Sequence, residues 1–306
     1  MMLRKVAAWT VCVLCALVIA LPVSAEQNSV LVDAVTYPEL AAAFSFRENA
    51  QVLEIFFPQI ADCDAALLRC DGETMLIDCA TPAQAESVVD MLKLLGVEKL
   101  DWLVSTHPHL DHIGGFDTVT EAVKVERLCV FHPEEENEYN KEAFRIARRR
   151  GIPVVEKCDG DRLTLGGAVI DVWLKCEGRR YNLNERSAQL RIAFGERTVL
   201  FTADAKHQTQ KMLLKHVDAE LLDVEILKYP HHGKDRLALR FTAATSPLFA
   251  VITNSGGERC LEGRKCLTYN EIPFAVTTPG TLFCATDGEK WLVRRLEEDE
   301  LRAYAQ

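Results

Sequence analysis

The stretch THPHLDHIGG, at positions 106–115, holds three of the chain's eight histidines and one aspartate within six residues. It overlaps the end of the apolar run DWLVST (101–106), which is typical of a buried strand. Alternate residues at a strand end point the same way, so His107 and His109 can share one metal ion. Asp111 and His112 lie on the following turn, from which they can reach a second ion. Zinc, manganese and iron all accept neutral imidazoles and carboxylates as ligands. The stretch therefore predicts a metal centre at the end of a buried strand.

Short apolar strands and amphipathic helices alternate along the rest of the chain. The runs VLEIFF, AALLRC and TMLIDC, between residues 52 and 79, are expected strands, and an Asp-Gly pair between the last two is a hairpin signal. Helices are expected at 81–96 and 137–150, and more strands follow towards the C-terminus. The interleaving predicts one layered α/β domain over 52–306, preceded by an N-terminal arm at 26–51.

Four motifs resemble, in order and spacing, those of the metallo-β-lactamase superfamily, and in particular its competence-protein (ComEC-like) subgroup. The first is H-x-H-x-D-H in the stretch above, and the others resemble N-x-x-S, T-G-D-A and K-x-x-H-H-G, at 184–187, 202–205 and 228–233. Asp78 matches the acidic residue that family members place beneath the metal site. The resemblance covers residues 52–294 and implies an α/β fold of the αββα sandwich type, with two mixed sheets packed face to face and helices outside.

The resemblance also implies a role for the polar residues of these motifs. The expected cofactor is one or two zinc ions, with manganese or iron as alternatives. The implied catalytic residues are Asp111 and His231, and the implied substrate contacts are Asn184 and Lys234. Spacing alone leaves open which histidine of the pair 231–232 binds metal, although the resemblance favours the second. The implied ligands of the first ion are His107 and His109. Those of the second ion are Asp111, His112 and His232, and Asp204 is implied to bridge the two ions.

Three departures from the family pattern affect the expected site. Asparagine stands where a third histidine for the first ion is usual, in the segment 182–187, so that ion would be held loosely. Ala203 replaces the usual glycine before the bridging aspartate and adds a Cβ near the ions. The segment 258–271 lacks the usual histidine, so the substrate would meet another donor: His231, Tyr269 or Lys234.

A metal-dependent hydrolase of phosphoester or phosphodiester bonds is the function that the resemblance implies. Two alternatives stay open: a metal-binding relative with little turnover that serves as an envelope binding module, and a hydrolase of β-lactam or lactone substrates. The formal net charge of −10 disfavours long nucleic acid as a partner, and a small anionic substrate held by the ions themselves fits this composition better than a polymer does. The content of 48% hydrophobic and 26% charged residues excludes general disorder.

The N-terminus predicts export of the domain. Arg4 and Lys5 precede an uncharged stretch at 6–25 that ends in small residues. This is the form of a secretory signal peptide, with an uncleaved anchor as the alternative. Either form places the domain outside the cytoplasm, as a secreted, periplasmic or membrane-anchored protein.

The 11 cysteines suggest disulfides if the protein is exported. Two of them lie within residues 1–25, which leaves 11 − 2 = 9 for the mature chain, so at least one thiol is unpaired. Cys260 and Cys266 flank a short loop, and we expect them to form a disulfide. Further pairings are open among Cys63, Cys70 and Cys79, and between Cys158 and Cys176.

Overall fold

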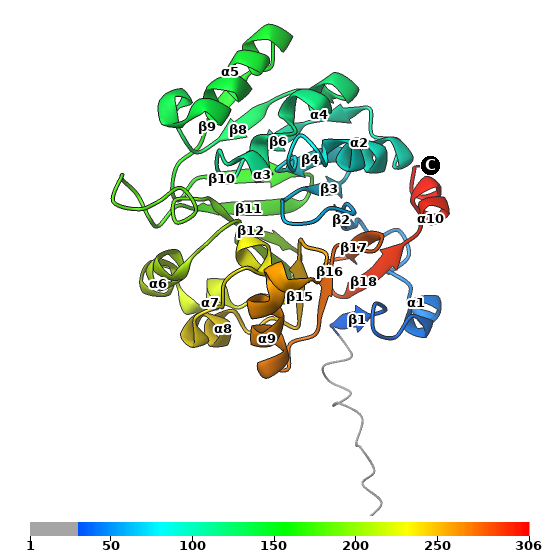
Figure 1. Cartoon of the computed structure of the whole chain (residues 1–306). Coiled ribbons are helices and arrows are strands. Elements are labelled where there is room, and N and C mark those ends of the chain that lie inside the picture. The colour runs from blue at the N-terminus through cyan, green and yellow to red at the C-terminus, as the bar shows by residue number, and fades with distance from the viewer. Residues whose placement is uncertain (1–29, 306) are drawn as a thin grey trace, which may run out of the picture.

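A computed structural model describes residues 30–305 of the chain. The expected signal segment at 1–25 lies outside the described residues. Two β-sheets pack face to face, and helices cover the outer side of each sheet (Figure 1). The αββα sandwich expected from the sequence is confirmed.

The first sheet is mixed and includes the expected hairpin. Its three central strands, which come from the runs between residues 52 and 79, are antiparallel, whereas the following strands are parallel. Part of the expected N-terminal arm adds a parallel strand at one edge. The spatial order of the nine strands is β1 (Leu31–Asp33), β18 (Trp291–Leu296), β17 (Thr281–Thr286), β2 (Leu53–Phe57), β3 (Ala66–Cys70), β4 (Glu73–Ile77), β6 (Trp102–Val104), β8 (Leu128–Val130) and β9 (Val154–Glu156).

The second sheet is also mixed. Its first four strands are antiparallel and its last four are parallel, with one strand shared by the two parts. The short strands β5 (Lys99–Leu100) and β7 (Lys124–Val125) pair separately. The spatial order of the seven strands is β10 (Arg162–Leu165), β11 (Ala168–Trp173), β12 (Gln189–Phe194), β13 (Arg197–Phe201), β14 (Ile226–Lys228), β15 (Phe249–Ile252) and β16 (Phe274–Val276).

Two groups of helices form the outer layers (Figure 1). The first sheet is covered by α2 (Ala85–Leu94), α4 (Phe116–Ala122) and α5 (Glu138–Arg150). The second sheet is covered by α6 (His207–His216), α7 (Ala219–Leu222), α8 (Leu239–Thr245) and α9 (Leu261–Tyr269). The shorter elements are α1 (Glu39–Ala43), α3 (Leu110–Ile113), α10 (Glu298–Ala303) and the 3₁₀ turns η2 (Glu134–Glu136), η3 (Pro230–Gly233) and η4 (Glu258–Cys260).

Three apolar cores join the layers. The central core lies between the sheets, where Phe57 of β2 and Phe201 of β13 stack with their ring centroids 5.8 Å apart. The outer cores lie beneath the two helix layers. Burial of apolar surface contributes about 25 cal/mol per Å², so the central core fixes one sheet on the other. This rigidity matters because both sheets contribute residues to the site described below.

Parallel strands of both sheets lead into the motifs. In the first sheet, β4 and β6 lead to Asp78 and His107. In the second sheet, β13 and β14 lead to Asp204 and the histidine pair 231–232. Loops at the carboxyl ends of neighbouring parallel strands meet at one edge of a sheet. The fold thus gathers four segments that are distant in the sequence.

The expected disulfide between Cys260 and Cys266 is not formed. The segment after residue 257 folds as η4 and α9 rather than as a loop, so Cys260 caps α9 and Cys266 lies inside that helix. Six helical residues span about 9 Å along the axis, whereas a disulfide joins Cα atoms at most about 7 Å apart. All nine cysteines in the described part of the chain are free, so none of the other pairings is formed either.

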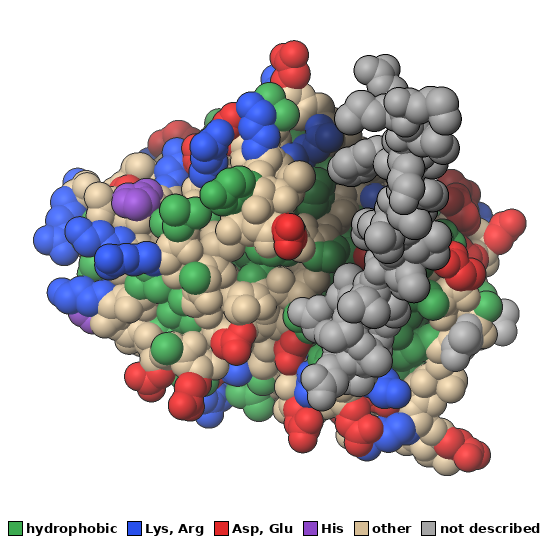
Figure 2. Space-filling model, turned by 90° about the horizontal axis from the view of Figure 1, so that it is seen from below, with side chains coloured by type: hydrophobic (Ala, Val, Ile, Leu, Met, Phe, Trp, Pro, Cys, Tyr) green, Lys and Arg blue, Asp and Glu red, His purple; other side chains and the backbone are tan. Residues whose placement is uncertain are grey.

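The surface of the molecule is unevenly charged. Seen from below the view of Figure 1, lysine and arginine side chains gather towards one edge, at the left of Figure 2. The net negative charge of the chain therefore coexists with a locally basic surface. In residues 30–305, no helix has both the length and the hydropathy that crossing a membrane requires.

Candidate metal centre

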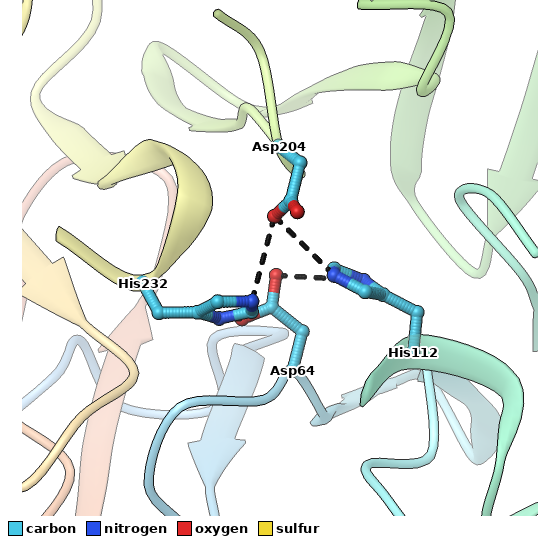
Figure 3. Close-up of side chains that lie close together, drawn as sticks. All are labelled: Asp64, His112, Asp204 and His232. Carbon is cyan, nitrogen blue, oxygen red and sulfur yellow. Dashed lines mark hydrogen bonds and ion pairs between the residues drawn. The ribbon is translucent and has the colours of Figure 1, made fainter. Parts of the chain in front are cut away.

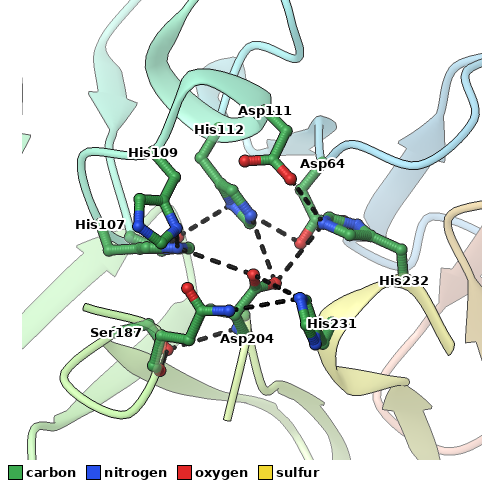
Figure 4. Close-up of polar contacts among 12 residues, drawn as sticks. Asp64, His107, His109, Asp111, His112, Ser187, Asp204, His231 and His232 are labelled. Carbon is green, nitrogen blue, oxygen red and sulfur yellow. Dashed lines mark hydrogen bonds and ion pairs between the residues drawn. The ribbon is translucent and has the colours of Figure 1, made fainter. Parts of the chain in front are cut away.

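The carboxylate of Asp204 lies at the centre of the gathered motifs (Figure 4). Its Oδ1 is 3.3 Å from Nε2 of His112 and 3.5 Å from Nε2 of His232. Its Oδ2 is 3.7 Å from Nε2 of His107 and 3.8 Å from Nε2 of His231. Each oxygen therefore faces a different pair of imidazoles, which is the arrangement that a bridging carboxylate needs.

Three buried polar atoms at this point have no hydrogen-bond partner among the described residues: Nε2 of His112, Nε2 of His232 and Oδ1 of Asp204. Buried polar atoms are normally paired, because leaving one unpaired costs about 1–3 kcal/mol. Asp111 adds a fourth donor, with its Oδ2 3.3 Å from Nε2 of His232. The donor atoms of His112, His232 and Asp204 lie within 4.8 Å of one another, and with Asp111 beside His232 they fit a divalent metal ion such as zinc.

A second group of donors lies on the other side of Asp204. Nε2 of His107 is 3.0 Å from Nδ1 of His109, and one donor atom from each of these residues and Asp204 lies within 4.8 Å of the others. Asn184, from the segment without the third histidine, reaches this side and lies 3.2 Å from Nε2 of His231 through its Nδ2. His107, His109 and Asp204 can together hold the first ion, which then has fewer protein ligands than the second ion has.

Two outer carboxylates orient the ligand imidazoles. Asp78 lies 2.8 Å from Nδ1 of His112 and also accepts hydrogen bonds from the backbone N–H and hydroxyl of Thr106. Asp64 lies 2.9 Å from Nδ1 of His232. A carboxylate that accepts the Nδ1 proton leaves the Nε2 lone pair free to bind a metal. Both imidazoles are thus held with Nε2 towards the centre.

Asp64 also lies close enough to be considered a ligand (Figure 3). Its carboxylate already accepts hydrogen bonds from the ammonium of Lys228, the hydroxyl of Thr253 and the imidazole of His232. Burial alone would raise the pKa of Asp64, but the Lys228 and His232 charges hold it well below its usual range. We therefore assign Asp64 to positioning His232. Sequence reasoning missed Asp64 because it belongs to none of the motifs.

Burial would lower the pKa of His112 and His232, but the carboxylates around them raise it, so these two imidazoles must release a proton when a metal ion binds. Two other central groups already suit metal binding. Burial and the charge of His112 hold the pKa of His107 well below its usual value, so this imidazole is neutral. Burial would raise the pKa of Asp204, but the neighbouring histidines 112 and 232 hold it well below its usual range. Metal ligands must be deprotonated, and both groups meet this requirement.

The two adjacent histidines of η3 face different surroundings. His232 is fully buried among the donors of the second ion, whereas the side chain of His231 is 16% exposed. Nδ1 of His231 is 2.6 Å from a carboxylate oxygen of Asp235. His232 therefore stays the proposed ligand, and His231 stays the proposed catalytic residue. Lys234, the other expected substrate contact beside Asn184, forms an ion pair with Asp62 at 2.8 Å.

Tight packing shapes the turn that carries Asp111 and His112. The backbone N–H of Cys79 donates to the carbonyl oxygen of His112 at 2.7 Å. A Cβ added to Gly115 would lie 2.0 Å from the carbonyl oxygen of Cys79. Only glycine fits there, which explains why the motif ends in glycine.

Strained backbone surrounds the site. Non-glycine residues with positive φ are uncommon, and they persist where the surrounding structure holds them, often at functional sites. In the described part of the chain ten such residues occur, and six of them adjoin the candidate site: Asp62, Asp78, Ala80, Ala203, His231 and His232.

The substitution Ala203→Gly is expected to stabilise the metal-free protein by about 0.5–1 kcal/mol. Ala203 has φ 44°, and relief of its Cβ clash outweighs the extra freedom that glycine adds to the unfolded chain. Urea unfolding with excess chelator measures the change. The control Ala205→Gly, at a position outside the left-handed region, should lower stability; a loss of stability in Ala203→Gly would contradict the strain argument.

Another buried imidazole, His132, lies outside the two donor groups. Burial lowers its pKa to about 4, and its Nε2 has no hydrogen-bond partner among the described residues. Below pH 6.5 the unfolded chain takes up a proton at this histidine, whereas the native protein does so only near pH 4. His132 therefore leaves stability unaffected above pH 6.5 and lowers it as the pH falls from 6.5 to 4.

Replacing His132 by glutamine should reduce the acid sensitivity of the metal-free protein. Between pH 7 and pH 5 the wild type should lose about 2 kcal/mol more than the variant, from a pKa difference of 6.5 − 4 = 2.5. Urea unfolding at the two pH values measures the loss for each protein. Equal losses in both proteins would show that His132 is not the group that titrates.

Comparison with known proteins agrees with this geometry. The family model described as "Metallo-beta-lactamase superfamily" matches residues 61–243, more than half of the chain. The chain is 26% identical over 192 residues to competence protein ComA of Neisseria gonorrhoeae, and 23% identical over 173 residues to ComE operon protein 3 of Bacillus subtilis (strain 168). These matches cover 62% and 56% of this chain but 25% and 22% of the relatives, so the chain corresponds to about a quarter of each.

Solved structures support the fold alone. The metallo-beta-lactamase fold protein YhfI from Bacillus subtilis matches with a TM-score of 0.51 and 12% identity, over 73% of this chain and 96% of that chain. Because the family model spans more than half of the sequence and agrees with the observed sandwich, the chain belongs to the metallo-beta-lactamase superfamily, and its competence-protein relatives confirm the expected resemblance to that subgroup.

Proposed function

We propose that this protein is a metal-dependent hydrolase of phosphoester or phosphodiester bonds. The observation that carries the proposal is the carboxylate of Asp204, whose two oxygens face separate groups of histidine donors. Zinc, manganese or iron would suit these donors. Two ions bound there would lower the pKa of a water molecule and stabilise the charge that develops on a phosphoryl group.

Two side chains of this chain are placed to act on the reacting groups. The carboxylate of Asp111 is 26% exposed, and burial would raise its pKa, but hydrogen bonding to His232 brings it to about 2, so Asp111 is ionised and can accept a hydrogen bond that orients the attacking water. Nδ1 of His231 faces a carboxylate oxygen of Asp235 at 2.6 Å, so a proton bound to Nε2 would lie on the open side of the site. There His231 can donate this proton to the oxygen of the leaving group. The side-chain amide nitrogen of Asn184 lies 3.2 Å from Nε2 of His231 and can donate its N–H to this nitrogen while it is unprotonated, which orients the ring.

Export is part of the proposal. The charged and apolar character of residues 1–25 supports a signal peptide or anchor. A small anionic phosphoester suits the charge of the chain better than long nucleic acid does. A β-lactam or lactone is the less favoured substrate, because the motifs resemble the competence-protein subgroup.

Turnover of bis(p-nitrophenyl) phosphate by the zinc-loaded protein tests the proposal. The substitution His231→Ala should lower kcat by roughly 10²–10⁴-fold, the usual contribution of a general acid, while the zinc content stays unchanged. The control His216→Ala, at an exposed position of α6, should leave kcat unchanged. Full metal occupancy without turnover of any ester class would overturn the proposal and favour the envelope binding module.

A further inference from the structure

Asp62, Lys234 and Arg259 form a charged cluster beside His232, one of the donors of the second ion. Nζ of Lys234 is 2.8 Å from Oδ1 of Asp62, and the guanidinium of Arg259 pairs with Oδ2 of the same carboxylate. Asp62 precedes Asp64 by two residues, and Lys234 follows His232 by two. Two cations therefore share one carboxylate, which leaves one excess positive charge.

Packing holds this cluster against the candidate metal centre. The backbone N–H of Asp62 donates to the carbonyl oxygen of Thr253 at 3.1 Å, and the hydroxyl of Thr253 contacts the ring of His232. A Cβ added to Gly233 would lie 2.8 Å from Cβ of Cys260, so η4, which carries Arg259, packs directly on η3. The cluster is thus part of the wall around His232.

Exposure differs among the three side chains in a way that suits an incoming anion. The side chains of Asp62, Lys234 and Arg259 are 19%, 29% and 77% exposed, so the guanidinium faces solvent while the carboxylate is half-buried. Exposed ion pairs contribute at most about 1 kcal/mol, and the fold does not depend on this one.

We propose that Lys234 and Arg259 form a seat for a phosphate group of the substrate, and that the carboxylate of Asp62 occupies this seat in the free protein. A guanidinium binds phosphate through two parallel hydrogen bonds, and an ammonium adds a point charge. The incoming phosphate displaces the Asp62 carboxylate from the two cations. The inference rests on the proposed function, because it places a non-reacting phosphate of the substrate beside the second ion. It makes Arg259 a specificity-determining residue that no motif indicates.

Binding of inorganic phosphate to the zinc-loaded full chain, measured by calorimetry, tests the seat. Arg259→Gln should weaken the Kd about 10-fold or more, since a charge-assisted hydrogen bond is lost. Asp62→Asn should tighten the Kd, because the internal competitor loses its charge. A purely structural ion-pair cluster would respond to both substitutions in the same direction.

The cluster of Glu262 with Arg236 and Lys265 provides a matched control. Here too an arginine and a lysine pair with one carboxylate, and all three side chains are at least 41% exposed. Arg236→Gln should leave the phosphate Kd within about two-fold of the wild type, as expected for an exposed pair. Three results would overturn the seat. The first is absence of phosphate binding, and the second is an equal change of the Kd in Arg259→Gln and Arg236→Gln. The third is a change of the Kd in the same direction in Arg259→Gln and Asp62→Asn.

Competition identifies the source of the phosphate group. A 5′-phosphorylated dinucleotide and phosphocholine are each added to the phosphate-bound protein. Displacement by either supports the seat and names the ester class, whereas displacement by neither contradicts it. These experiments measure binding and not hydrolysis. If the Kd values change as expected but the protein hydrolyses no ester, the proposed hydrolase is contradicted while the seat is supported.

Discussion

Replacing Asp204 by asparagine is expected to abolish the binding of both metal ions and to lower hydrolysis by roughly 10³-fold or more. The carboxylate is 1% exposed, and each oxygen faces a separate donor group. Asparagine keeps the shape but offers a single neutral carbonyl oxygen. Zinc at 1,000 times its Kd should stabilise the wild type by about 4 kcal/mol, and this gain should vanish in the variant.

Metal content per chain, kcat and zinc-dependent thermal stability together measure the effect of Asp204→Asn. Asp218→Asn is the matched control, because Asp218 is exposed at the start of α7 and its side chain makes no capping hydrogen bond. The control should keep both ions and full activity. Retention of two ions per chain by Asp204→Asn would contradict the bridging role.

Replacing Lys228 by methionine is expected to destabilise the metal-free protein by about 3–5 kcal/mol, the usual effect of leaving a buried charge unpaired. Lys228 is 2% exposed and forms an ion pair with Asp64, which is itself buried. Methionine fills most of the same space without the ammonium. Urea unfolding measures the loss, and the exposed Lys211→Met provides the control, with little change expected.

The double variant Lys228→Met with Asp64→Asn separates charge from packing. Removing the second charge should restore part of the lost stability, which appears as a coupling energy in the double-mutant cycle. If the two single losses simply add, the ion pair contributes no coupling and the argument for a buried charge pair is wrong.

Much of the fold and of the candidate site follows from local signals in the sequence. The apolar run before His107 predicts a strand that ends at the first motif, and the structure confirms that strand as β6. The helix over 137–150 was expected from its pattern, and it begins where the Asn137 side chain accepts a hydrogen bond from the backbone of Asn140. These features are local, so a single chain displays them.

Features that depend on long-range packing were not predictable. Asp64 contacts Lys228 and His232 across more than 160 positions of sequence, and no spacing rule joins them. The disulfide prediction was wrong for a related reason: the short segment between Cys260 and Cys266 suggested a loop, but it packs on η3 as a helix. Tertiary contacts decided both cases.

The bridging position of Asp204 between two metal ions is tested most directly by anomalous diffraction from crystals of the zinc-loaded protein. We expect two zinc peaks, one on each side of the Asp204 carboxylate, each about 2 Å from one of its oxygens. One peak should adjoin Nε2 of His112 and His232, and the other should adjoin the histidines at 107 and 109. A single peak, or zinc bound only at other places on the protein, would contradict the two-metal site.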